Sequence, residues 1–329
     1  MAITGAGLEG VVATTSSICF IDGEAGTTGL EIRERLAARR DLELLAIAPD
    51  RRKDDRARAD ILNSADVAIL CLPDAAAKGA VNLVESNHTR VIDASTAHRT
   101  APGWTYGFAE LEPDGYAQIA AARRVSNPGC WPTGFLAIAR PLLRAGLIPA
   151  DFPLTANGVS GYSGAGKSMI AEFEDKQAAD YTETVSRLYG LNLAHKHIPE
   201  MQKHSGLAHP PLFEPSIGRF YRGMLVEVPL QLWALPAGPS VRDIHAALAR
   251  AYPDRPLVKV ASLEDAAAVK SLDAEILAGS NGLALYVFAN EKAAQVRLVA
   301  AFDNLGKGAG GAAVQNLNIM LGLPETTGL

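Results

Sequence analysis

An apolar run, a glycine-rich turn and a helix-like segment follow one another near the N-terminus, and this order constrains the fold most. Residues 18–21 predict a buried strand. Glycine recurs at Gly23, Gly26 and Gly29, and residues 30–36 continue with helical spacing. Such a unit binds the phosphates of a dinucleotide, because backbone N–H groups and the helix dipole point at the ligand. The spacing is a variant of the usual fingerprint, so a turn without a ligand is the alternative.

The cofactor is predicted from this turn and from the end of the next strand, expected over residues 42–48. Asp50 could bind a free ribose 2′-hydroxyl, but Arg51, Arg52 and Lys53 follow at once, and a 2′-phosphate requires positive charge. We therefore predict NADP(H), with a solvated run of charges as the alternative. The candidate contacts in these two places are Gly23, Glu24, Ala25, Gly26, Thr27, Thr28, Gly29, Arg51 and Arg52.

Strands and helices continue to alternate, with a strand at 67–72, a helix at 75–86 and a strand at 90–93. This alternation predicts an α/β fold with a Rossmann-type doubly wound parallel sheet, whose ligands bind at the carboxyl ends of the strands. Arg99, in the loop after the last of these strands, could hold an anionic group in a bidentate manner, with an exposed surface arginine as the alternative. The candidates at these strand ends are Cys71 and Pro73 for the cofactor, and Ser95 and Arg99 for the substrate.

A second turn, Ser-Asn-Pro-Gly-Cys-Trp-Pro-Thr-Gly at residues 126–134, leads into a helical run at 135–143. Pro128 fixes φ and Gly129 permits a close backbone approach, so Cys130 is expected on a sharp turn at a helix N-terminus. Free N–H groups and the helix dipole favour negative charge there. We therefore predict a lowered pKa and a nucleophilic thiolate. A buried structural cysteine is the alternative, and this is the interpretation preferred for the other cysteines, Cys19 and Cys71.

Two histidines, His195 and His197, are separated by a single residue and followed by Glu200. In an extended segment both imidazoles would face the same side. A thiol on a turn needs an imidazole that takes up and returns protons, and Glu200 could orient it. The same side chains could bind zinc together with Cys130. We prefer acid–base chemistry and expect no metal.

The pattern changes in the second half of the chain, where long strand-like runs outnumber helices. These runs cover residues 154–156, 225–235, 283–289 and 295–301. Ser240 is expected to cap a helix over 241–252, with Asp243 in a capping box. We predict an α+β catalytic domain with a mainly antiparallel sheet. The expected divisions are 1–126 for the cofactor domain with 1–16 as a loose leader, 127–303 for the catalytic and oligomerisation domain, and 304–329 for a C-terminal helix.

Residues 161–168 match the Walker A spacing in full, which keeps a P-loop nucleotide hydrolase open, with Asp303 as its acidic strand end. A backbone nest with Lys167 could equally hold a substrate phosphate or carboxylate. The glycine-rich helix entry at 303–311 implies a close approach, and it could cover the nicotinamide. The candidates are Ser163, Gly164 and Lys167 for the substrate, and Asn304 for the cofactor.

Composition narrows the class of protein. A net charge of −5 with scattered basic residues argues against nucleic-acid binding, and no apolar run reaches the length of a membrane span. Three distant cysteines make no disulfide framework, and residues 1–16 lack the basic start of a signal peptide, so we expect a cytoplasmic protein. An exposed sheet often becomes an interface, and we expect a homo-oligomer, a dimer or tetramer.

Taken together, these motifs resemble the N-acetyl-γ-glutamyl-phosphate reductase family of arginine biosynthesis, in particular its shorter type. The resemblance rests on stretches 23–29, 127–133, 163–167, 195–200 and 304–308, which run in the family's order. It implies a Rossmann domain, NADPH, Cys130 as the nucleophile and a C-terminal helix that returns to the first domain. It also implies a fold plan similar to that of aspartate-semialdehyde dehydrogenase.

The implied reaction is reduction of an acyl phosphate through a cysteine thioester, which yields N-acetylglutamate 5-semialdehyde and phosphate. The Cys130 backbone N–H and Asn127 are candidate donors to the oxyanion. One histidine of the pair transfers the proton, and we prefer His195. Arg99 and Lys167 would hold the phosphate or carboxylate. Aspartyl and aminoadipyl phosphates stay open as substrates, as does an NADP-binding regulator without catalysis.

Overall fold

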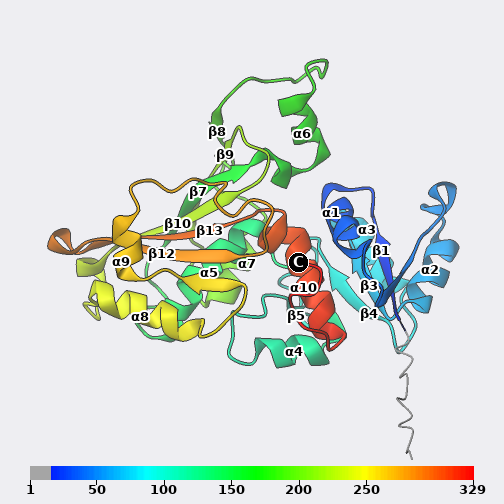
Figure 1. Ribbon diagram of the computed structural model, residues 1–329, viewed down its shortest axis with the longest axis horizontal. Coiled ribbons are helices and arrows are strands. Elements are labelled where there is room, and N and C mark those ends of the chain that lie inside the picture. The colour runs from blue at the N-terminus through cyan, green and yellow to red at the C-terminus, as the bar shows by residue number, and fades with distance from the viewer. Residues whose placement is uncertain (1–15) are drawn as a thin grey trace, which may run out of the picture.

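The computed structural model describes residues 16–329 and shows two lobes with a C-terminal helix, α10 (Gly311–Met320), between them (Figure 1). The predicted leader lies outside the described residues, apart from Ser16. No helix of the described part is long and apolar enough to cross a membrane. The predicted division of the chain after residues 126 and 303 stays a prediction.

The first lobe contains a six-stranded, fully parallel sheet in the order β2-β1-β3-β4-β6-β5. The chain moves from β1 outward to β2 and then to β3 on the other side of β1. This reversal is the switch point at which ligands bind in such sheets. The predicted Rossmann-type fold is therefore confirmed. Its strands are β1 (Ser17–Asp22), β2 (Leu42–Leu45), β3 (Val67–Leu70), β4 (Arg90–Asp93), β5 (Thr105–Tyr106) and β6 (Arg124–Ser126).

Helices of this lobe bury apolar side chains against the sheet and leave their polar sides in solvent. In α1, Ile32 and Leu36 are buried, whereas Leu30, at the same predicted spacing, is exposed. Asp54 caps α2 by accepting the backbone N–H groups of Arg56 and Ala57. The helices are α1 (Thr27–Leu36), α2 (Asp55–Ser64), α3 (Asp74–Asn82) and α4 (Gly115–Ala121), with a short turn η1 (Pro49–Arg51).

The second lobe contains a seven-stranded sheet in the order β11-β12-β13-β10-β7-β9-β8. Its pairs are antiparallel except β11 with β12 and β7 with β9. The prediction missed β9, which carries Pro215 and is not a typical apolar run. The strands are β7 (Thr155–Gly161), β8 (Ser186–Leu188), β9 (Leu212–Gly218), β10 (Met224–Gln231), β11 (Val258–Val260), β12 (Leu283–Asn290) and β13 (Gln295–Phe302).

Helix α5 (Cys130–Arg144) packs on this sheet. Its residues are buried on almost every side of the helix. Phe135 and Leu136 share one core with Val226 of β10 and Phe302 at the end of β13. The predicted capping box of α8 (Val241–Ala251) is present, with Ser240 and Asp243 bonded reciprocally. The remaining elements are α6 (Lys167–Glu174), α7 (Ile198–Ser205), α9 (Leu263–Ala268), η2 (Tyr162–Ala165), η3 (Leu232–Ala234), η4 (Glu291–Ala293) and η5 (Gly306–Gly310).

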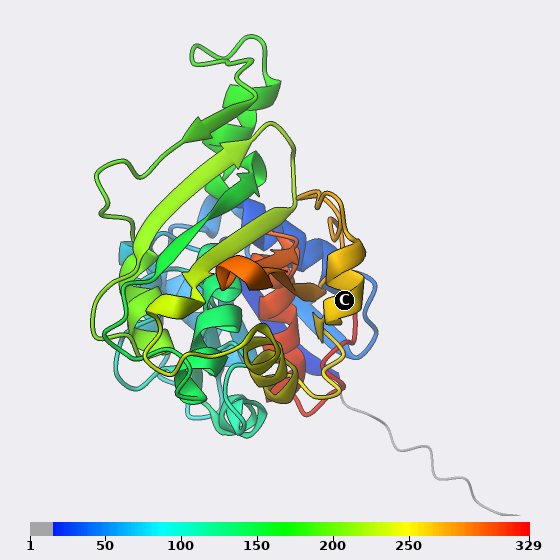
Figure 2. The same ribbon diagram turned by 90° about the vertical axis from the view of Figure 1, so that its left-hand side faces the viewer.

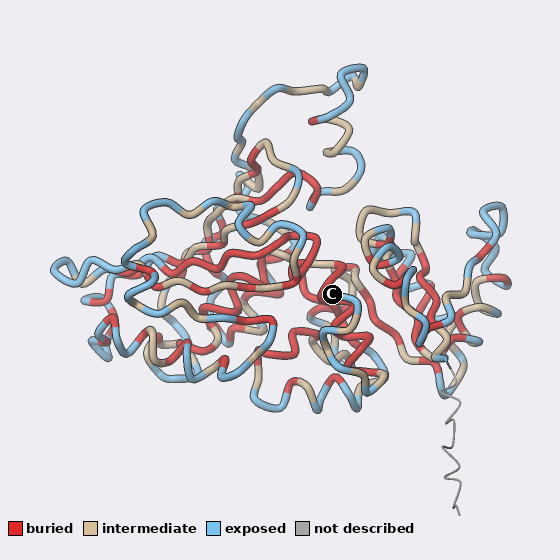
Figure 3. Tube along the Cα trace, in the orientation of Figure 1, coloured by how far each residue is buried: buried red, intermediate tan, exposed pale blue. Residues whose placement is uncertain are grey.

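Helix α10 returns to the first lobe, as the resemblance implied. Val314 and Leu317 belong to the same apolar core as Cys19 of β1 and Ile32 of α1. Figure 3 shows this helix buried along its length, whereas the excursion that carries α6 and β8 is largely exposed. Figure 2 shows that excursion projecting from the body.

A buried ion pair fixes the start of this last segment. The Lys307 ammonium lies in η5 and is 2% exposed. It donates to Glu110 Oε1 at 2.7 Å, to Glu110 Oε2 at 2.9 Å and to Gln315 Oε1 at 2.6 Å. Three acceptors thus satisfy the three N–H groups of the ammonium. Removing one partner would leave the other charge buried without compensation.

Lys307→Met is therefore expected to destabilise the protein by about 3–5 kcal/mol, because Glu110 would remain as an unpaired buried carboxylate. Urea unfolding followed by circular dichroism measures the change. The double variant Lys307→Met/Glu110→Leu should recover much of the loss, since no buried charge remains. The exposed pair Arg297–Glu227 is the control, and Arg297→Met should cost about 1 kcal/mol or less. An equal loss of stability in Lys307→Met and Arg297→Met would contradict this account.

Candidate active site

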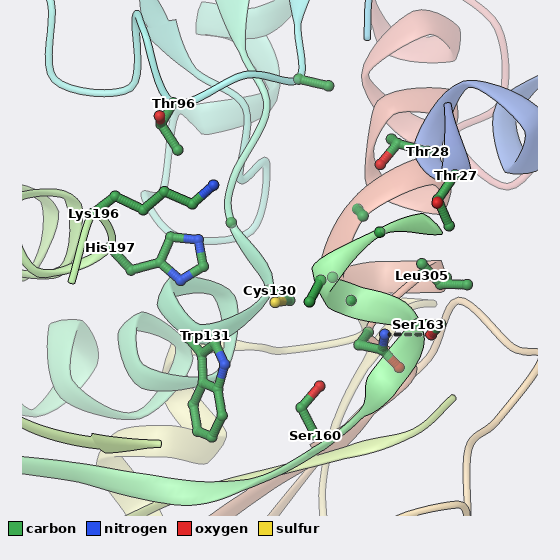
Figure 4. Close-up of a pocket in the computed structure, with 18 of the residues that line it drawn as sticks. Thr27, Thr28, Thr96, Cys130, Trp131, Ser160, Ser163, Lys196, His197 and Leu305 are labelled. Carbon is green, nitrogen blue, oxygen red and sulfur yellow. Dashed lines mark hydrogen bonds between the residues drawn. The ribbon is translucent and has the colours of Figure 1, made fainter. Parts of the chain in front are cut away.

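A cavity of about 820 Å³ lies at the carboxyl edge of the parallel sheet and extends to the second lobe (Figure 4). It is bordered by the glycine turn, the loops after β3 and β4, the start of α5, the segment between β7 and α6, and η5. Most predicted site residues meet here. Those that line the cavity are Gly26, Thr27, Thr28, Cys71, Pro73, Ser95, Arg99, Asn127, Cys130, Ser163, Gly164, Lys167, His195, His197 and Asn304.

The glycine turn fits a dinucleotide phosphate. Gly23 has φ +88°, and a Cβ there would overlap the Cys71 carbonyl at the end of β3, so only glycine lets the turn lie this close. Gly26 precedes α1, and no side chain caps this helix N-terminus. The Thr27 hydroxyl is buried without a hydrogen-bond partner. A buried donor beside an uncapped helix N-terminus suits an anionic oxygen.

The basic residues after β2 lie beyond the lining of this cavity. Arg52 donates to Glu24 Oε1 at 2.7 Å, and Arg51 donates to Asp54 at 3.1 Å. Glu24 also accepts from Arg33, at 2.9 Å. Gly23, Glu24, Ala25 and Gly29 build the turn without lining the cavity. Binding of a 2′-phosphate by Arg51 and Arg52 stays a prediction.

Cys130 is the first residue of α5, and its backbone position is closely fixed. The N–H of Gly129 donates to Glu200 Oε1 at 2.8 Å. A Cβ on Gly129 would lie 2.7 Å from His197 Nε2, so a larger residue would displace the imidazole. A Cβ on Gly308 of η5 would lie 2.9 Å from the Cys130 Cβ. The segment that carries His197 and the segment that carries Gly308 therefore both pack closely against the cysteine turn.

The predicted lowering of the Cys130 pKa is wrong for the protein without ligands. Part of the side chain faces the cavity, but burial of the thiol raises its pKa to about 11. The nearby Arg99 charge and the N–H groups of Trp131 and Cys130 lower the pKa without compensating for burial. The loss of hydration on burial thus raises the pKa of Cys130 more than the helix N-terminus lowers it. The thiol is protonated at neutral pH.

Glu200 does not orient an imidazole, and this prediction is wrong. Its carboxylate accepts the Gly129 N–H at 2.8 Å, the Tyr106 hydroxyl at 2.7 Å and Arg99 Nη1 at 3.0 Å. Placement of Glu200 in the first buried turn of α7 directs its oxygens at the cysteine turn instead. Glu200 therefore positions the segment that carries Cys130.

Arg99 does not present a free bidentate fork, which corrects a third prediction. Besides Glu200, it donates through Nε to the Asn127 carbonyl at 3.0 Å and through Nη2 to the Ala94 carbonyl at 3.2 Å. These internal acceptors occupy three of its five N–H groups. The guanidinium contributes positive charge to the cavity while it joins the loop after β4 to the turn before α5.

The histidine pair lies in a turn before α7 and not in the predicted extended segment. The His197 N–H donates to His195 Nδ1 at 3.2 Å, so neutral His195 carries its proton on Nε2. Burial lowers the pKa of His195. Burial, followed by the charge of Arg99, lowers the pKa of His197 well below its usual value. Both rings are therefore neutral near pH 7, and His197 Nδ1 is buried without a partner.

Among residues 16–329, no three histidine, cysteine or carboxylate side chains lie close enough together to hold a metal ion. The zinc alternative consequently has no ligand set in this part of the chain. Ser95 contributes differently from the histidines: its hydroxyl donates to Asp93 at 2.8 Å, and Asp93 also bonds to His98 at 2.6 Å. These contacts fix the loop after β4.

The Walker-like stretch ends β7 and leads through η2 into α6. Its Ser163 hydroxyl accepts Asn304 Nδ2 at 3.0 Å, which joins two predicted candidates. Asp303 is not an acidic partner of this stretch, because β10 separates β13 from β7. Asp303 instead accepts the backbone N–H groups of Leu305 and Gly306. The arrangement does not support a P-loop hydrolase.

The side-chain amide of Asn127 is already held by two hydrogen bonds inside the protein. Its Nδ2 donates to the Ala309 carbonyl at 2.9 Å, and its Oδ1 accepts Asn316 Nδ2 at 3.0 Å. One amide N–H is left for a ligand. Asn127 therefore also ties the cysteine turn to η5 and α10.

Sequence reasoning missed several residues around the cysteine. Tyr106 bonds to Glu200 and stacks on His204 with ring centroids 3.7 Å apart. His204 in turn bonds to the Arg99 carbonyl at 2.7 Å. Tyr189 and Lys196 line the cavity. Only Lys196 gave a usable signal, because it lies between the two histidines in the sequence.

Alkylation of Cys130 by iodoacetamide in the ligand-free protein should accelerate with pH up to about 11, because the thiolate is the reactive form. Peptide-resolved mass spectrometry after timed labelling measures the rate at Cys130 separately from Cys19 and Cys71. Cys130→Ser provides the control for assignment of the peptide. An inflection at or below about 8.5, the value for a free thiol, would contradict the dominance of burial.

Comparison with known proteins places both lobes in one family. The family model described as "Semialdehyde dehydrogenase, NAD binding domain" matches residues 20–119, and that described as "Semialdehyde dehydrogenase, dimerisation domain" matches residues 130–304. Aspartate semialdehyde dehydrogenase from Francisella tularensis has the same fold, with a TM-score of 0.68, 15% identity and coverage of 93% of this chain and 100% of that one. The Candida albicans enzyme, solved with NADP, gives a TM-score of 0.63 at 13% identity, covering 93% and 98%.

Closer relatives identify the branch of that family. The N-acetyl-gamma-glutamyl-phosphate reductase of Trichormus variabilis is 55% identical over 316 residues, which cover 94% of this chain and 98% of the relative. The protein of the same name from Brucella ovis is 55% identical over 304 residues, covering 92% and 98%. The chain therefore belongs to the semialdehyde dehydrogenase family and, within it, to the N-acetyl-gamma-glutamyl-phosphate reductases.

Proposed function

We propose that this protein reduces N-acetyl-γ-glutamyl phosphate to N-acetylglutamate 5-semialdehyde and phosphate with NADPH. One observation carries the proposal: a single cavity contains a cysteine at a helix N-terminus, two neutral imidazoles and a dinucleotide-type glycine turn. The names of relatives at 55% identity support the N-acetylglutamyl substrate over aspartyl or aminoadipyl phosphate.

The cofactor would be held by the turn at Gly26, Thr27 and Thr28, and by Cys71 and Pro73 across the switch point. When bound, NADPH supplies the hydride that converts a thioester into a thiohemiacetal. The contact of Arg52 with Glu24 of this turn, with Arg51 next to Arg52 in the chain, supports a 2′-phosphate and therefore NADP(H) over NAD(H). Arg52 would have to exchange its contact with Glu24 for the phosphate.

The nucleophile acts from a protonated resting state. Because the pKa of the Cys130 thiol is raised, an imidazole must take its proton as the sulfur attacks the acyl carbonyl. A bond forms between sulfur and the carbonyl carbon, and the bond from that carbon to the phosphate oxygen breaks. Backbone N–H groups at the start of α5 and the spare N–H of Asn127 would stabilise the oxyanion. The product is a thioester and free phosphate.

We assign the proton transfers to His195. Its Nδ1 accepts the His197 N–H in the ligand-free protein, so the ring can take the thiol proton on Nε2 only when it releases this contact and carries its own proton on Nδ1. The imidazolium can then give its Nε2 proton to the oxygen of the reduced carbonyl, and the ring receives it again when the thiohemiacetal collapses to the aldehyde and the Cys130 thiolate. His197 lies against Gly129, and its pKa, strongly lowered by burial and by the charge of Arg99, suits a neutral positioning group.

An oligomer completes the proposal, because one of the matching family models is described as a dimerisation domain. Apolar side chains are exposed on the projecting excursion around β8, which is an edge strand. We propose a homodimer or homotetramer that covers this excursion. The exposed side chains are Val185, Leu188, Leu191 and Leu193.

Cys130→Ser should reduce turnover by several orders of magnitude while NADPH binding changes little, because the hydroxyl is a far weaker nucleophile. The assay follows phosphate-dependent reduction of NADP or NAD at 340 nm with a panel of semialdehydes. It thereby tests reaction class, chain length and cofactor preference. Fluorescence titration with NADPH gives the binding control. Substantial remaining activity in the variant would exclude the covalent route.

His195→Gln should lower kcat by about 10²–10⁴-fold with a small change in KM, since it removes general acid–base catalysis. His197→Gln is the matched variant, and its loss should be smaller because it removes a contact with the cysteine turn only. Steady-state kinetics over pH 6–9 separates the two. A larger loss of kcat in His197→Gln would reverse the assignment.

A further inference from the structure

The basic side chains that line the cavity differ in whether they are already paired. Arg99 holds Glu200 at 3.0 Å, and Arg187 holds Glu172 at 2.6 Å. Lys167 and Lys196 also line the cavity. Neither lysine ammonium has an ion pair or a side-chain hydrogen bond with the described residues, so both charges are available to a ligand.

Lys196 is the unpaired cation next to the reacting groups. It lies between the two histidines, and Figure 4 shows its ammonium directed into the cavity, beside the region occupied by His197 and Cys130. Its positive charge contributes to the lowered pKa of both His195 and His197. Lys167 begins α6, at the end of the segment that follows β7.

The substrate places two anionic groups at different distances from the sulfur. The phosphate is joined to the attacked carbonyl carbon through a single oxygen, whereas the carboxylate lies at the opposite end of the acyl chain. The unpaired cation beside the imidazoles must therefore face the phosphate. A cation farther along the cavity suits the carboxylate.

The carboxylate of Asp74, which lies near Lys196, does not prevent a phosphate from binding to Lys196. Asp74 accepts the Thr96 N–H at 3.0 Å and the Thr96 hydroxyl at 2.5 Å, so its oxygens are already engaged. Partial burial would raise its pKa, but those hydrogen bonds, with the charges of Lys196 and Arg99, lower it. A phosphate between Lys196 and Arg99 would meet two positive charges and two carboxylates, Asp74 and Glu200, and Glu200 is already paired with Arg99.

We propose that Lys196 binds the phosphoryl group of the substrate, and inorganic phosphate in the reverse direction. This inference rests on the proposed function and names a residue for its leaving group. In the forward direction, Lys196 balances the charge that gathers on the phosphate as its bond to the carbonyl carbon breaks. In reverse, it holds the phosphate whose oxygen attacks the thioester and expels the Cys130 thiolate.

The reverse reaction tests the proposal, because phosphate and semialdehyde are then separate reactants. Lys196→Gln should raise the KM for phosphate about tenfold or more, as expected for loss of a charge-assisted hydrogen bond. The KM values for semialdehyde and NADP should stay within about twofold of wild type, and Lys196→Arg should recover part of the phosphate affinity. Lys270→Gln, at an exposed lysine outside the cavity, removes the same charge and should match wild type.

A second measurement does not depend on turnover. Inorganic phosphate should protect Cys130 of the wild type from iodoacetamide, and Lys196→Gln should need about tenfold more phosphate for the same protection. An unchanged phosphate dependence in both measurements would overturn the proposal, as would a rise confined to the KM for semialdehyde. Protection that requires Lys196 in a protein without reductase activity would retain the phosphate site and refute the proposed function.

Discussion

The geometry of the candidate site depends on one buried carboxylate, that of Glu200. It accepts hydrogen bonds from a backbone N–H of the cysteine turn, from a tyrosine of the parallel sheet and from Arg99. These donors lie between Arg99 and Gly129, 71 to 101 residues before Glu200 in the sequence. A buried carboxylate without such partners would be strongly unfavourable, so the three segments are held together by the requirement to satisfy it.

The C-terminal segment provides a second restraint on the same turn. Gly308 lies against the Cys130 Cβ, and the Ala309 carbonyl accepts the Asn127 amide. The buried pair of Lys307 and Glu110 fixes η5, and α10 continues into the core of the first lobe. The last residues of the chain thus connect the cofactor lobe to the nucleophile. A π-type turn at this place agrees with the frequent occurrence of such turns at functional sites.

The electrostatics of the cysteine explain why two imidazoles accompany it. A helix N-terminus and Arg99 favour a thiolate, but burial outweighs them and keeps the thiol protonated. Burial also lowers the pKa of both histidines, so a permanent thiolate–imidazolium pair is not favoured. In this environment the Cys130 thiol therefore loses its proton as the sulfur attacks the substrate. A bound dinucleotide would change the same balance by excluding more water and adding charge.

The sequence by itself determined the local units: the strand, turn and helix around Gly23, the position of Cys130 at the start of a helix, and the capping box at Ser240. Each depends on neighbouring residues, whose φ preferences, spacing and capping are local properties. The tertiary structure alone decided that Glu200 and Arg99 pair inside the protein and that Lys196 lines the cavity. Whether a charged side chain pairs inside the protein or faces a ligand depends on distant segments that meet only after folding. The same holds for the pKa of Cys130, because desolvation is set by the atoms that surround the thiol and not by its neighbours in sequence.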